Sequence, residues 1–419
     1  MQRSSVQPKL VCSLFAALLP LLGGCAPNEH ERTARDAVWD YQNANFAGAA
    51  VKLRPLGDQT DGDFVLNNLR LGSATLAAGD LPQAEAAFLR AYEVLNSVGV
   101  NNGGRTLGAV VVGENMKVWK GEPFERAMAN HYLGLIYYLR GDYANARAAY
   151  ENALFKLRDY ADDHGNKQDS REVDSDFALA SLMLGKCWLH LGRNDLAQAN
   201  FDRVTSLRPE LAPVARVASE PRNNILLLVD FGYGPQKEYS GDGSLAGFGP
   251  KPSQIGGIPS PAVAVDGRPY DLQGTGWPPV DLLALAQQQR WQSIDTIRTI
   301  KNVAGYGLMG AGAYEGLGRR HNDPLLGAAL FGAGLLLRSS ASADLRYWDT
   351  LPRTTFVLPL QLSPGKHTIT VEFPAVGLRQ TWRGLVAPEQ GEAAYYFRIL
   401  RSSTGPFDWS PGPPPAGNP

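Results

Sequence analysis

The residue types that most often carry chemistry in proteins are few in this chain and widely spaced. Its six histidines lie at positions 30, 131, 164, 190, 321 and 367, and its three cysteines at positions 12, 25 and 187. These residues form neither an HExxH motif nor a paired-cysteine metal spacing, and the chain has no G-x-S-x-G nucleophile elbow. The sequence therefore predicts no catalytic residue, no metal ligand and no cofactor. We expect a protein that is not an enzyme.

Two further patterns could carry chemistry but have simpler explanations. Asp162, Asp163 and His164 form a cluster within the strongly polar stretch 159–174, which is typical of a solvated loop. The run from Gly305 to Gly310 fits G-x-G-x-x-G, but it follows a predicted helix rather than a strand and no βαβ unit surrounds it. The formal net charge of −1 leaves no field of one sign, so nucleic acid is not an expected partner.

The one cysteine with a strong local context is Cys25. It follows an apolar run of 13 residues, Leu10 to Leu22, which fits the core of a signal peptide and is too short to span a bilayer. The segment from Leu22 to Cys25, LGGC, resembles the lipobox of bacterial lipoproteins. That resemblance implies cleavage before Cys25 and lipid attachment to it, and Ala26 implies the outer membrane facing the periplasm. The alternative is an ordinary cleaved signal peptide, residues 1–25, with a chance cysteine.

Three stretches repeat one pattern of small and aromatic residues. Each resembles the tetratricopeptide repeat (TPR) signature, in which L-G-x2-Y is followed by an alanine and then an aromatic residue. The matches are Leu71, Gly72, Gly79, Ala84, Phe88 and Ala91; Leu133, Gly134, Tyr137, Gly141, Ala146, Tyr150 and Ala153; and Leu184, Gly185, Trp188, Gly192, Ala197 and Phe201, with Pro209 closing the unit. The sequence therefore predicts a TPR α-solenoid over residues 30–209, with residues 30–64 as a degenerate capping hairpin.

The small residues of the signature have a packing role. Gly134 and Ala146 allow two antiparallel helices to approach closely, and Tyr150 fills the gap to the next hairpin. The glycines that open the three matches are 62 and 51 residues apart, against a period of about 34, so insertions separate the repeats. These insertions fall at 101–122 and 159–174.

In TPR proteins the first helix of each hairpin lines a groove that holds segments of partner proteins. Carried over by position, seven residues of this chain would line it: Arg70, Ser73, His131, Leu135, Tyr138, Lys186 and His190. The alternative at each position is that the side chain only covers the core. We expect His131 and His190 to pack or bind rather than to hold a metal.

The second half, residues 220–402, has the pattern of strands. ILLLVDF at 225–231 predicts a buried strand, 354–362 and 366–373 predict a hairpin around Ser363-Pro364-Gly365, and further strands are expected at 262–265, 380–385 and 393–400. The strand at 366–373 alternates, with one face formed by His367, Ile369, Val371 and Phe373 and the other by Thr368, Thr370 and Glu372. Together they predict a small antiparallel β-sandwich, so the fold class is α+β. Residues 403–419 are Pro-rich and predict a disordered tail.

A helical, glycine-rich insertion at 280–340 interrupts the strands. Asp281 is a plausible N-cap for a helix that runs to about Asn302, and Leu325 to Leu337 is a second apolar run of 13 residues. One interpretation is a tight helical hairpin buried against the sandwich. The other is a segment that associates with or oligomerises on a membrane, although it is too short to span one alone.

Two landmarks suggest a family. Residues 117–126 (KVWKGEPFER) and 344–352 (DLRYWDTLP) resemble landmarks of a family of uncharacterised bacterial TPR-repeat lipoproteins, and the similarity runs from about residue 30 to residue 400. Trp119 and Phe124 replace tyrosines of that family's motif. We expect Trp348 and Leu351 to anchor the core, and Arg346 and Asp344 to form a local ion pair.

These observations favour an outer-membrane-anchored periplasmic lipoprotein that acts as a protein–protein interaction scaffold. Its partners would be other envelope proteins, and the N-terminal lipid would hold it at the membrane. The alternatives are a regulator of a peptidoglycan synthase, which the family resemblance suggests, and a membrane-assembly component that uses the glycine-rich hairpin. The sequence does not predict the oligomeric state.

Overall fold

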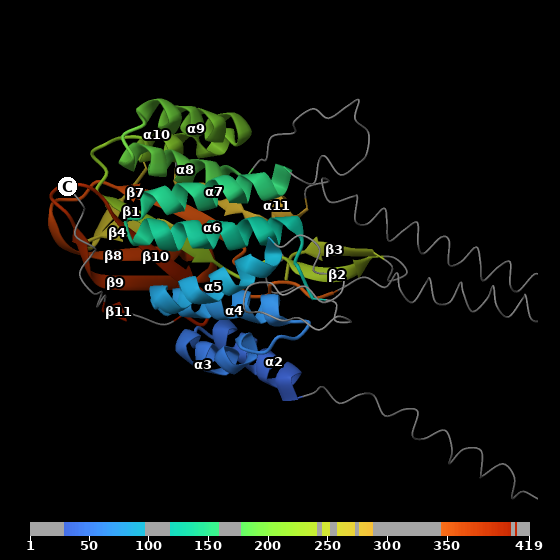
Figure 1. Ribbon diagram of the computed structural model, residues 1–419. Coiled ribbons are helices and arrows are strands. Elements are labelled where there is room, and N and C mark those ends of the chain that lie inside the picture. The colour runs from blue at the N-terminus through green and yellow to red at the C-terminus, as the bar shows by residue number, and fades with distance from the viewer. Residues whose placement is uncertain are drawn as a thin grey trace, which may run out of the picture.

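A computed structural model places a helical layer over one face of a β-sheet, and a second sheet closes the other face (Figure 1). It describes residues 29–96, 118–158, 177–240, 245–251, 258–272, 276–287, 345–403 and 407–408. An N-terminal region of helical hairpins is followed by a β-sheet region, which confirms the predicted α+β class. The two regions share one continuous apolar core.

The helices pair as antiparallel hairpins along the chain. Their bounds are α2 Glu29–Gln42, α3 Phe46–Gly57, α4 Phe64–Ala77, α5 Leu81–Leu95, α6 Pro123–Leu139, α7 Tyr143–Arg158, α8 Ala178–His190, α9 Asn194–Leu207 and α10 Ala212–Ala218. Gly79, Gly141 and Gly192 end the first helix of three hairpins with a positive φ of 71° to 82°. A residue without Cβ adopts that left-handed conformation at low cost, so these glycines set the turns.

In all three hairpins, the aromatic residue of the second helix packs against the glycine of the first helix, a contact within one hairpin rather than the predicted one with the next hairpin. A Cβ atom added at Gly72 would lie 2.8 Å from the ring of Phe88, and one added at Gly134 would lie 2.9 Å from that of Tyr150. The third pair, Gly185 and Phe201, has the same geometry at 2.9 Å. Each aromatic ring therefore occupies the space that a side chain would need, and this contact fixes the distance between the two helices of a hairpin.

The helical region extends beyond both ends of the three repeats. The α2–α3 pair forms the expected capping hairpin and packs on α4. At the other end, a short 3-10 turn at Pro209–Leu211 leads into α10, so the helices continue to Ala218 rather than stopping at residue 209.

The β region forms two sheets and one separate hairpin. A four-stranded sheet has the order β10-β1-β7-β6, a five-stranded sheet has the order β11-β9-β8-β4-β5, and β2 pairs with β3. The strands are β1 Ile225–Phe231, β2 Gln236–Ser240, β3 Leu245–Gly249, β4 Ala262–Val265, β5 Arg268–Tyr270, β6 Val280–Asp281, β7 Thr354–Leu360, β8 Gly365–Phe373, β9 Leu378–Ala387, β10 Ala393–Ile399 and β11 Phe407–Asp408.

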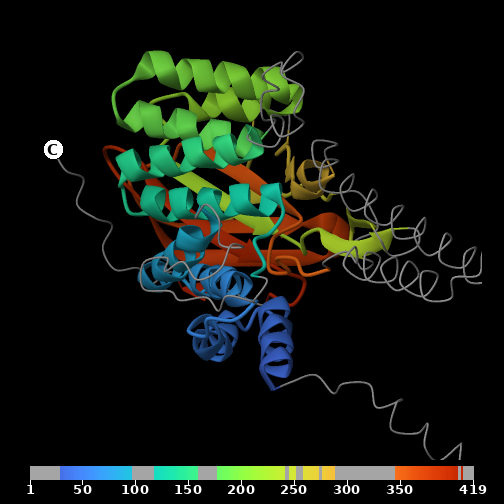
Figure 2. The ribbon, with the colours of Figure 1, turned by 45° about the vertical axis from the view of Figure 1, so that its right-hand side comes forward.

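The four-stranded sheet lies between the helices and the five-stranded sheet, as Figures 1 and 2 both show. All seven residues of its central strand β1 are buried, because side chains on both faces are covered. Phe231 stacks on Phe373 of the second sheet, with 4.0 Å between ring centroids, whereas Asp230 on the other face meets Tyr132 of α6. The continuous apolar run of β1 thus reflects a strand enclosed between two layers.

Two details of the predicted sandwich are wrong. Strands β7 and β8 do not form a hairpin: β7 pairs with β1, and β8 pairs with β9 and β4, so the turn at 363–365 carries the chain from one sheet to the other. The sandwich is also not purely antiparallel, because β10 runs parallel to β1 and β11 parallel to β9. The inward face predicted for β8 is confirmed, with Ile369, Val371 and Phe373 fully buried.

Asp281 caps a helix as predicted, and its side chain accepts a hydrogen bond from the amide of Leu283. That helix, α11, covers Leu282–Ala286, and the rest of the predicted insertion lies outside the described residues. So do the signal peptide, Cys25 and the end of the tail, although β11 shows that residues 407 and 408 belong to a strand. Among the described helices, none is both long and apolar enough to cross a bilayer.

Candidate functional site

The predicted groove lies on the face of the helical array that the β region covers. Five of the seven predicted residues, on helices α4, α6 and α8, contact the segments that lead into strands β7 and β10, whereas His131 and Leu135 are buried core residues. In this structure, the chain's own segments therefore occupy the groove.

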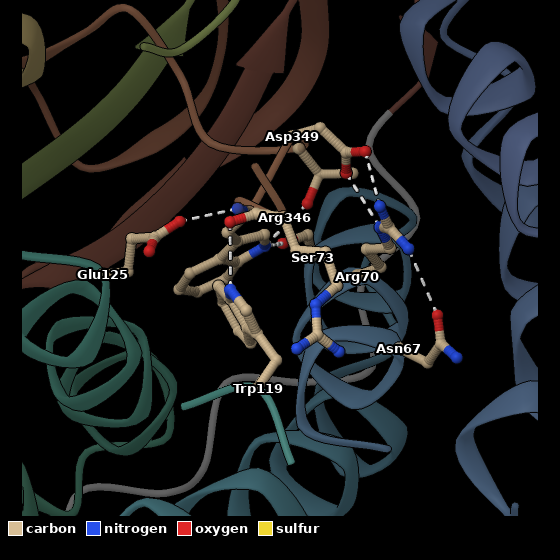
Figure 3. A network of polar contacts seen from close by, with 9 residues as sticks. Asn67, Arg70, Ser73, Trp119, Glu125, Arg346 and Asp349 are labelled. Atoms are coloured by element: carbon tan, nitrogen blue, oxygen red, sulfur yellow. Dashed lines mark hydrogen bonds and ion pairs between the residues drawn. The ribbon is translucent and has the colours of Figure 1, made fainter. Parts of the chain in front are cut away.

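At the α4 end, Arg70 and Ser73 hold the segment just before β7 (Figure 3). Arg70 forms a two-pronged ion pair with Asp349, with nitrogen–oxygen distances of 2.9 and 2.7 Å. The hydroxyl of Ser73 accepts a hydrogen bond from the indole nitrogen of Trp348 at 3.1 Å. Trp348 is completely buried and Leu351 is 1% exposed. Both were predicted to anchor the core, and their burial confirms this.

The two landmark segments of the sequence contact each other here (Figure 3). The indole nitrogen of Trp119 donates to the carbonyl oxygen of Arg346 at 3.0 Å, and the amide of Trp348 donates to Glu125 at 2.6 Å. The guanidinium of Arg346 pairs with Asp63 at 2.8 Å. Asp344, its predicted partner, lies outside the described residues. The landmarks are thus two sides of one interface.

Glu125 is the most strongly perturbed acid of this interface. Burial raises its pKa to about 8, although the backbone amides of Glu122 and Trp348 and the ammonium of Lys237 act to lower it. The carboxyl group closes a capping box at the start of α6 and also receives the amide of Trp348, so it joins the helix to the segment before β7. Its role is structural in this arrangement.

In the middle of the groove, two of the three predicted residues of α6 are core residues. His131 is 1% exposed and lies among the rings of Tyr132, Tyr150 and Phe177. Burial lowers its pKa to about 3, so the ring is neutral at physiological pH. Leu135 is completely buried. Both positions therefore follow the alternative interpretation, in which the side chain covers the core.

The residue of α6 that reaches the β-sheet is Tyr132, which the sequence did not single out. Its hydroxyl donates to the carboxylate of Asp230 in β1 at 2.7 Å, and Tyr396 of β10 donates to the same carboxylate at 2.9 Å. Burial raises the pKa of Asp230, while Arg398 and the surrounding hydroxyls act to lower it. The signal for this site was visible: Asp230 is the one charged residue in an otherwise apolar strand.

At the α8 end, three predicted residues converge on one carboxylate, that of Glu392 in the connection before β10. Lys186 Nζ lies 2.7 Å from its Oε2, and the hydroxyl of Tyr138 donates to its Oε1 at 2.5 Å. His190 Nε2 lies 3.4 Å from Oε1 and 3.0 Å from the hydroxyl of Tyr138. We call Tyr138, Lys186 and His190 the carboxylate site.

The carboxylate site is dry and charged. The side chains of Lys186 and Glu392 are 4% and 3% exposed, and that of His190 is 19% exposed. Burial acts to raise the pKa of Glu392, but the opposing effects of Lys186 and His190 dominate and hold it below its ordinary value. The glutamate is therefore ionised, and it balances the charge of the lysine. Nothing in its local sequence, PEQGEAA, marks it for this role.

Cys187, next to Lys186, is a free and completely buried thiol. Burial raises its pKa, so the reactive thiolate form is disfavoured at neutral pH. Among the residues that the structure describes, no group of three or more His, Cys, Asp or Glu side chains is arranged to hold a metal ion.

Comparisons with solved structures show a distant likeness over part of the chain. No family model matches the sequence, and no curated protein matches it. Two crystal structures of MamA, a TPR-repeat protein, are similar to about half of this chain. Their sequence identities are 15% and 18%, and each has a TM-score of 0.30. The matches cover 46% and 48% of this chain and 82% of each MamA chain.

Proposed function

We propose that this protein is a lipid-anchored scaffold of the bacterial envelope, which binds other envelope proteins through its TPR-like helical array and does not catalyse a reaction. The observation that carries the proposal is the array itself, with its three glycine–aromatic contacts and its capping hairpin. Helical repeats of this kind present extended surfaces that commonly bind segments of partner proteins.

The proposed anchor is a lipid on Cys25 at the outer membrane, facing the periplasm. Support comes from the LGGC segment and from the distance along the chain to the folded part. Helix α2 begins at Glu29, which is the fourth residue after the anchor. Four extended residues reach roughly 14 Å at most. The array would therefore lie close to the membrane surface, and partners would meet it there.

The outward surfaces of the array offer places for first contact. Among the described residues, large apolar side chains are exposed at Trp39 on α2 (65%), Val51 on α3 (66%) and Phe155 on α7 (49%). Val376, between β8 and β9, is also partly exposed but belongs to the sheet layer on the far side of the molecule. A scaffold that works through its helices would contact partners at the first three positions and not at the fourth.

Site-specific photo-crosslinking in intact cells tests this proposal. A benzophenone amino acid is placed at Trp39, Val51, Phe155 or Val376 in the full-length protein. We expect capture of the same envelope protein from at least one helical position and no capture from Val376. A peptidoglycan synthase in the captured band would identify the protein as its regulator. Capture of nothing, or only of a second copy of this chain, would refute the scaffold.

The anchor needs its own test. The Cys25→Ser variant removes the thiol that would receive the lipid, so metabolic labelling with a radioactive fatty acid should mark the wild type and not the variant. The variant should also leave the membrane fraction. Equal labelling of the two proteins would exclude Cys25 as the anchor.

A further inference from the structure

We propose that the carboxylate site binds acidic segments from outside the molecule, and that such a segment of a partner protein takes the place of the residue that now fills it. That residue is Glu392, which belongs to this same chain. The inference rests on the proposed scaffold function, because it names the class of partner that the groove accepts.

The geometry of the site defines its ligand. One ammonium, one phenol hydroxyl and one imidazole converge on a single carboxylate from two helices, α6 and α8. The ring of Tyr143 stacks on that of His190, with 3.9 Å between centroids and 3° between planes, and so fixes the imidazole in place. All three groups belong to the helical array, so the site is preformed on the array and complete without the β region.

The chemistry of the site demands an anion. Lys186 is almost completely buried, and its ammonium also donates to the carbonyl oxygen of Ala218 at 3.2 Å. A buried ammonium that loses its counterion is strongly unfavourable, so the site is stable only when a carboxylate is present. The polar contacts of the three side chains with Glu392 involve only its carboxylate oxygens, so a carboxylate from another protein could fill the site equally well.

The present occupant sits on a segment that can move without unfolding the sheet. Glu392 ends the connection 388–392 between β9 and β10, and its neighbours Glu389, Gln390 and Gly391 are exposed. The pairing of β10 with β1 begins one residue later, at Ala393 and Ile225. Withdrawal of the side chain therefore breaks the contacts of one loop, whereas the rest of the groove is held by Asp349 and Asp230 on other segments.

The route of entry is given by the exposure of the site. Lys186 and Tyr138 are enclosed, but the side chain of His190 is 19% exposed, so the solvent edge of the site lies at the imidazole. An acidic side chain that enters along this edge reaches His190 first and Lys186 last. The incoming carboxylate would therefore replace that of Glu392 stepwise, and the site would not pass through an empty state.

Chemical rescue tests the site itself. The mature protein with Glu392→Ala lacks the internal carboxylate, and we expect its thermal midpoint to fall and then to rise by several degrees in sodium acetate relative to sodium chloride at equal ionic strength. The wild type and the Glu392→Ala/Lys186→Met double variant should show no such acetate effect. Equal responses to acetate in the single and double variants would overturn the assignment of the site.

Exchange with an outside segment needs a second measurement. The probe is a fluorescein-labelled Ac-Gly-Glu-Gly-Glu-Gly-NH2 peptide, with its glutamine counterpart as the control. We expect the glutamate peptide to bind Glu392→Ala at least about tenfold more tightly than the wild type, because the internal carboxylate competes. Glu389→Ala, an exposed change on the same connection, should bind like the wild type. Binding that is equal for the two peptides, or unaffected by Lys186→Met, would refute the inference.

If Glu392→Ala does not fold, Glu392→Gln keeps the shape of the side chain and removes only its charge. It should still bind the glutamate peptide more tightly than the wild type, and failure to do so would equally refute the inference. The result is separable from the scaffold test. A protein that crosslinks to partners in cells but shows no carboxylate-dependent binding refutes this inference alone. One that binds the peptide but captures no protein refutes the scaffold.

Discussion

The carboxylate of Glu125 accepts a hydrogen bond from the amide of Trp348, 223 residues further along the chain, at 2.6 Å. This contact joins the start of α6 to the segment that leads into β7. The contact is buried and involves an ionisable group. The stability of the packing between the helical and β regions therefore depends on pH.

Glu125 predicts a loss of stability as pH rises. Below pH 4.5 the carboxyl group is protonated in both the folded and the unfolded chain, whereas between 4.5 and about 8 only the folded chain keeps the proton. The contribution of Glu125 to the free energy of unfolding should therefore fall across this window, by at most about 1.4 kcal/mol per pH unit, and His131 does not offset it between pH 6.5 and about 8, where that ring is neutral in both states. Urea unfolding of Glu125→Gln should lose this slope. A slope that persists in the variant would assign it to another group.

His131 predicts the opposite dependence on the acidic side. Its folded pKa of about 3 lies below the ordinary value of 6.5, so the unfolded chain takes up a proton first as pH falls. The contribution of His131 to the free energy of unfolding should decline from pH 6.5 downward, again by at most about 1.4 kcal/mol per unit, and between pH 6.5 and 4.5 it opposes the contribution of Glu125. In NMR spectra of protein labelled with 15N-histidine, the chemical shifts of the His131 ring should be those of a neutral imidazole at pH 5. A midpoint near 6.5 in the folded protein would contradict this.

The glycine–aromatic contacts predict that the repeats tolerate no side chain at Gly134. Its Cβ would lie 2.9 Å from Tyr150, a fully buried ring that has no room to move. We expect Gly134→Ala to lower the free energy of unfolding by about 1–3 kcal/mol. Gly247→Ala on β3 is the control, since no atom lies within 4 Å of its added Cβ. Equal stability of the two variants would show that the contact is not tight.

The ion pair between Arg70 and Asp349 should matter because both side chains are largely covered, at 14% and 16% exposure. Arg70→Ala leaves a carboxylate without its partner, and we expect a loss of about 2 kcal/mol in urea unfolding. Arg193→Ala breaks a comparable pair with Asp195 that is solvent-exposed, and should leave the unfolding midpoint unchanged. A loss of similar size in the control would rule out burial as the cause.

The local features of the fold were predictable from sequence because they depend on near neighbours. The spacing of Gly134, Ala146 and Tyr150 identified a hairpin, and the alternation in 366–373 identified the buried face of a strand. Which strands pair with each other was harder to predict from the sequence. A turn such as Ser363-Pro364-Gly365 permits a hairpin, but burial of β7 against the helices favours its pairing with β1, which lies more than 120 residues earlier.

For the groove, position in the repeat identified residues that contact other segments, but not the segments themselves. Lys186, Tyr138 and His190 meet, yet their shared partner Glu392 lies in a connection with no distinguishing pattern. His131 and Leu135, also predicted to line the groove, are core residues: both are buried, and His131 lies among the rings of Tyr132, Tyr150 and Phe177. Whether a groove is open or filled depends on what the rest of the chain packs against it, which repeat spacing does not encode.

The parallel pairing of β1 with β10 also constrains how the protein is made. Strand β1 is completed only when residues 354–360 and 393–399 have both arrived, although the helices that lie against it were finished near residue 218. During synthesis, the array therefore exists for some time with an uncovered apolar face and an unneutralised Lys186. Contacts this distant in sequence form slowly, and a partly exposed intermediate is prone to aggregate. Cells that produce this protein must keep the helical half soluble until the last strand is in place.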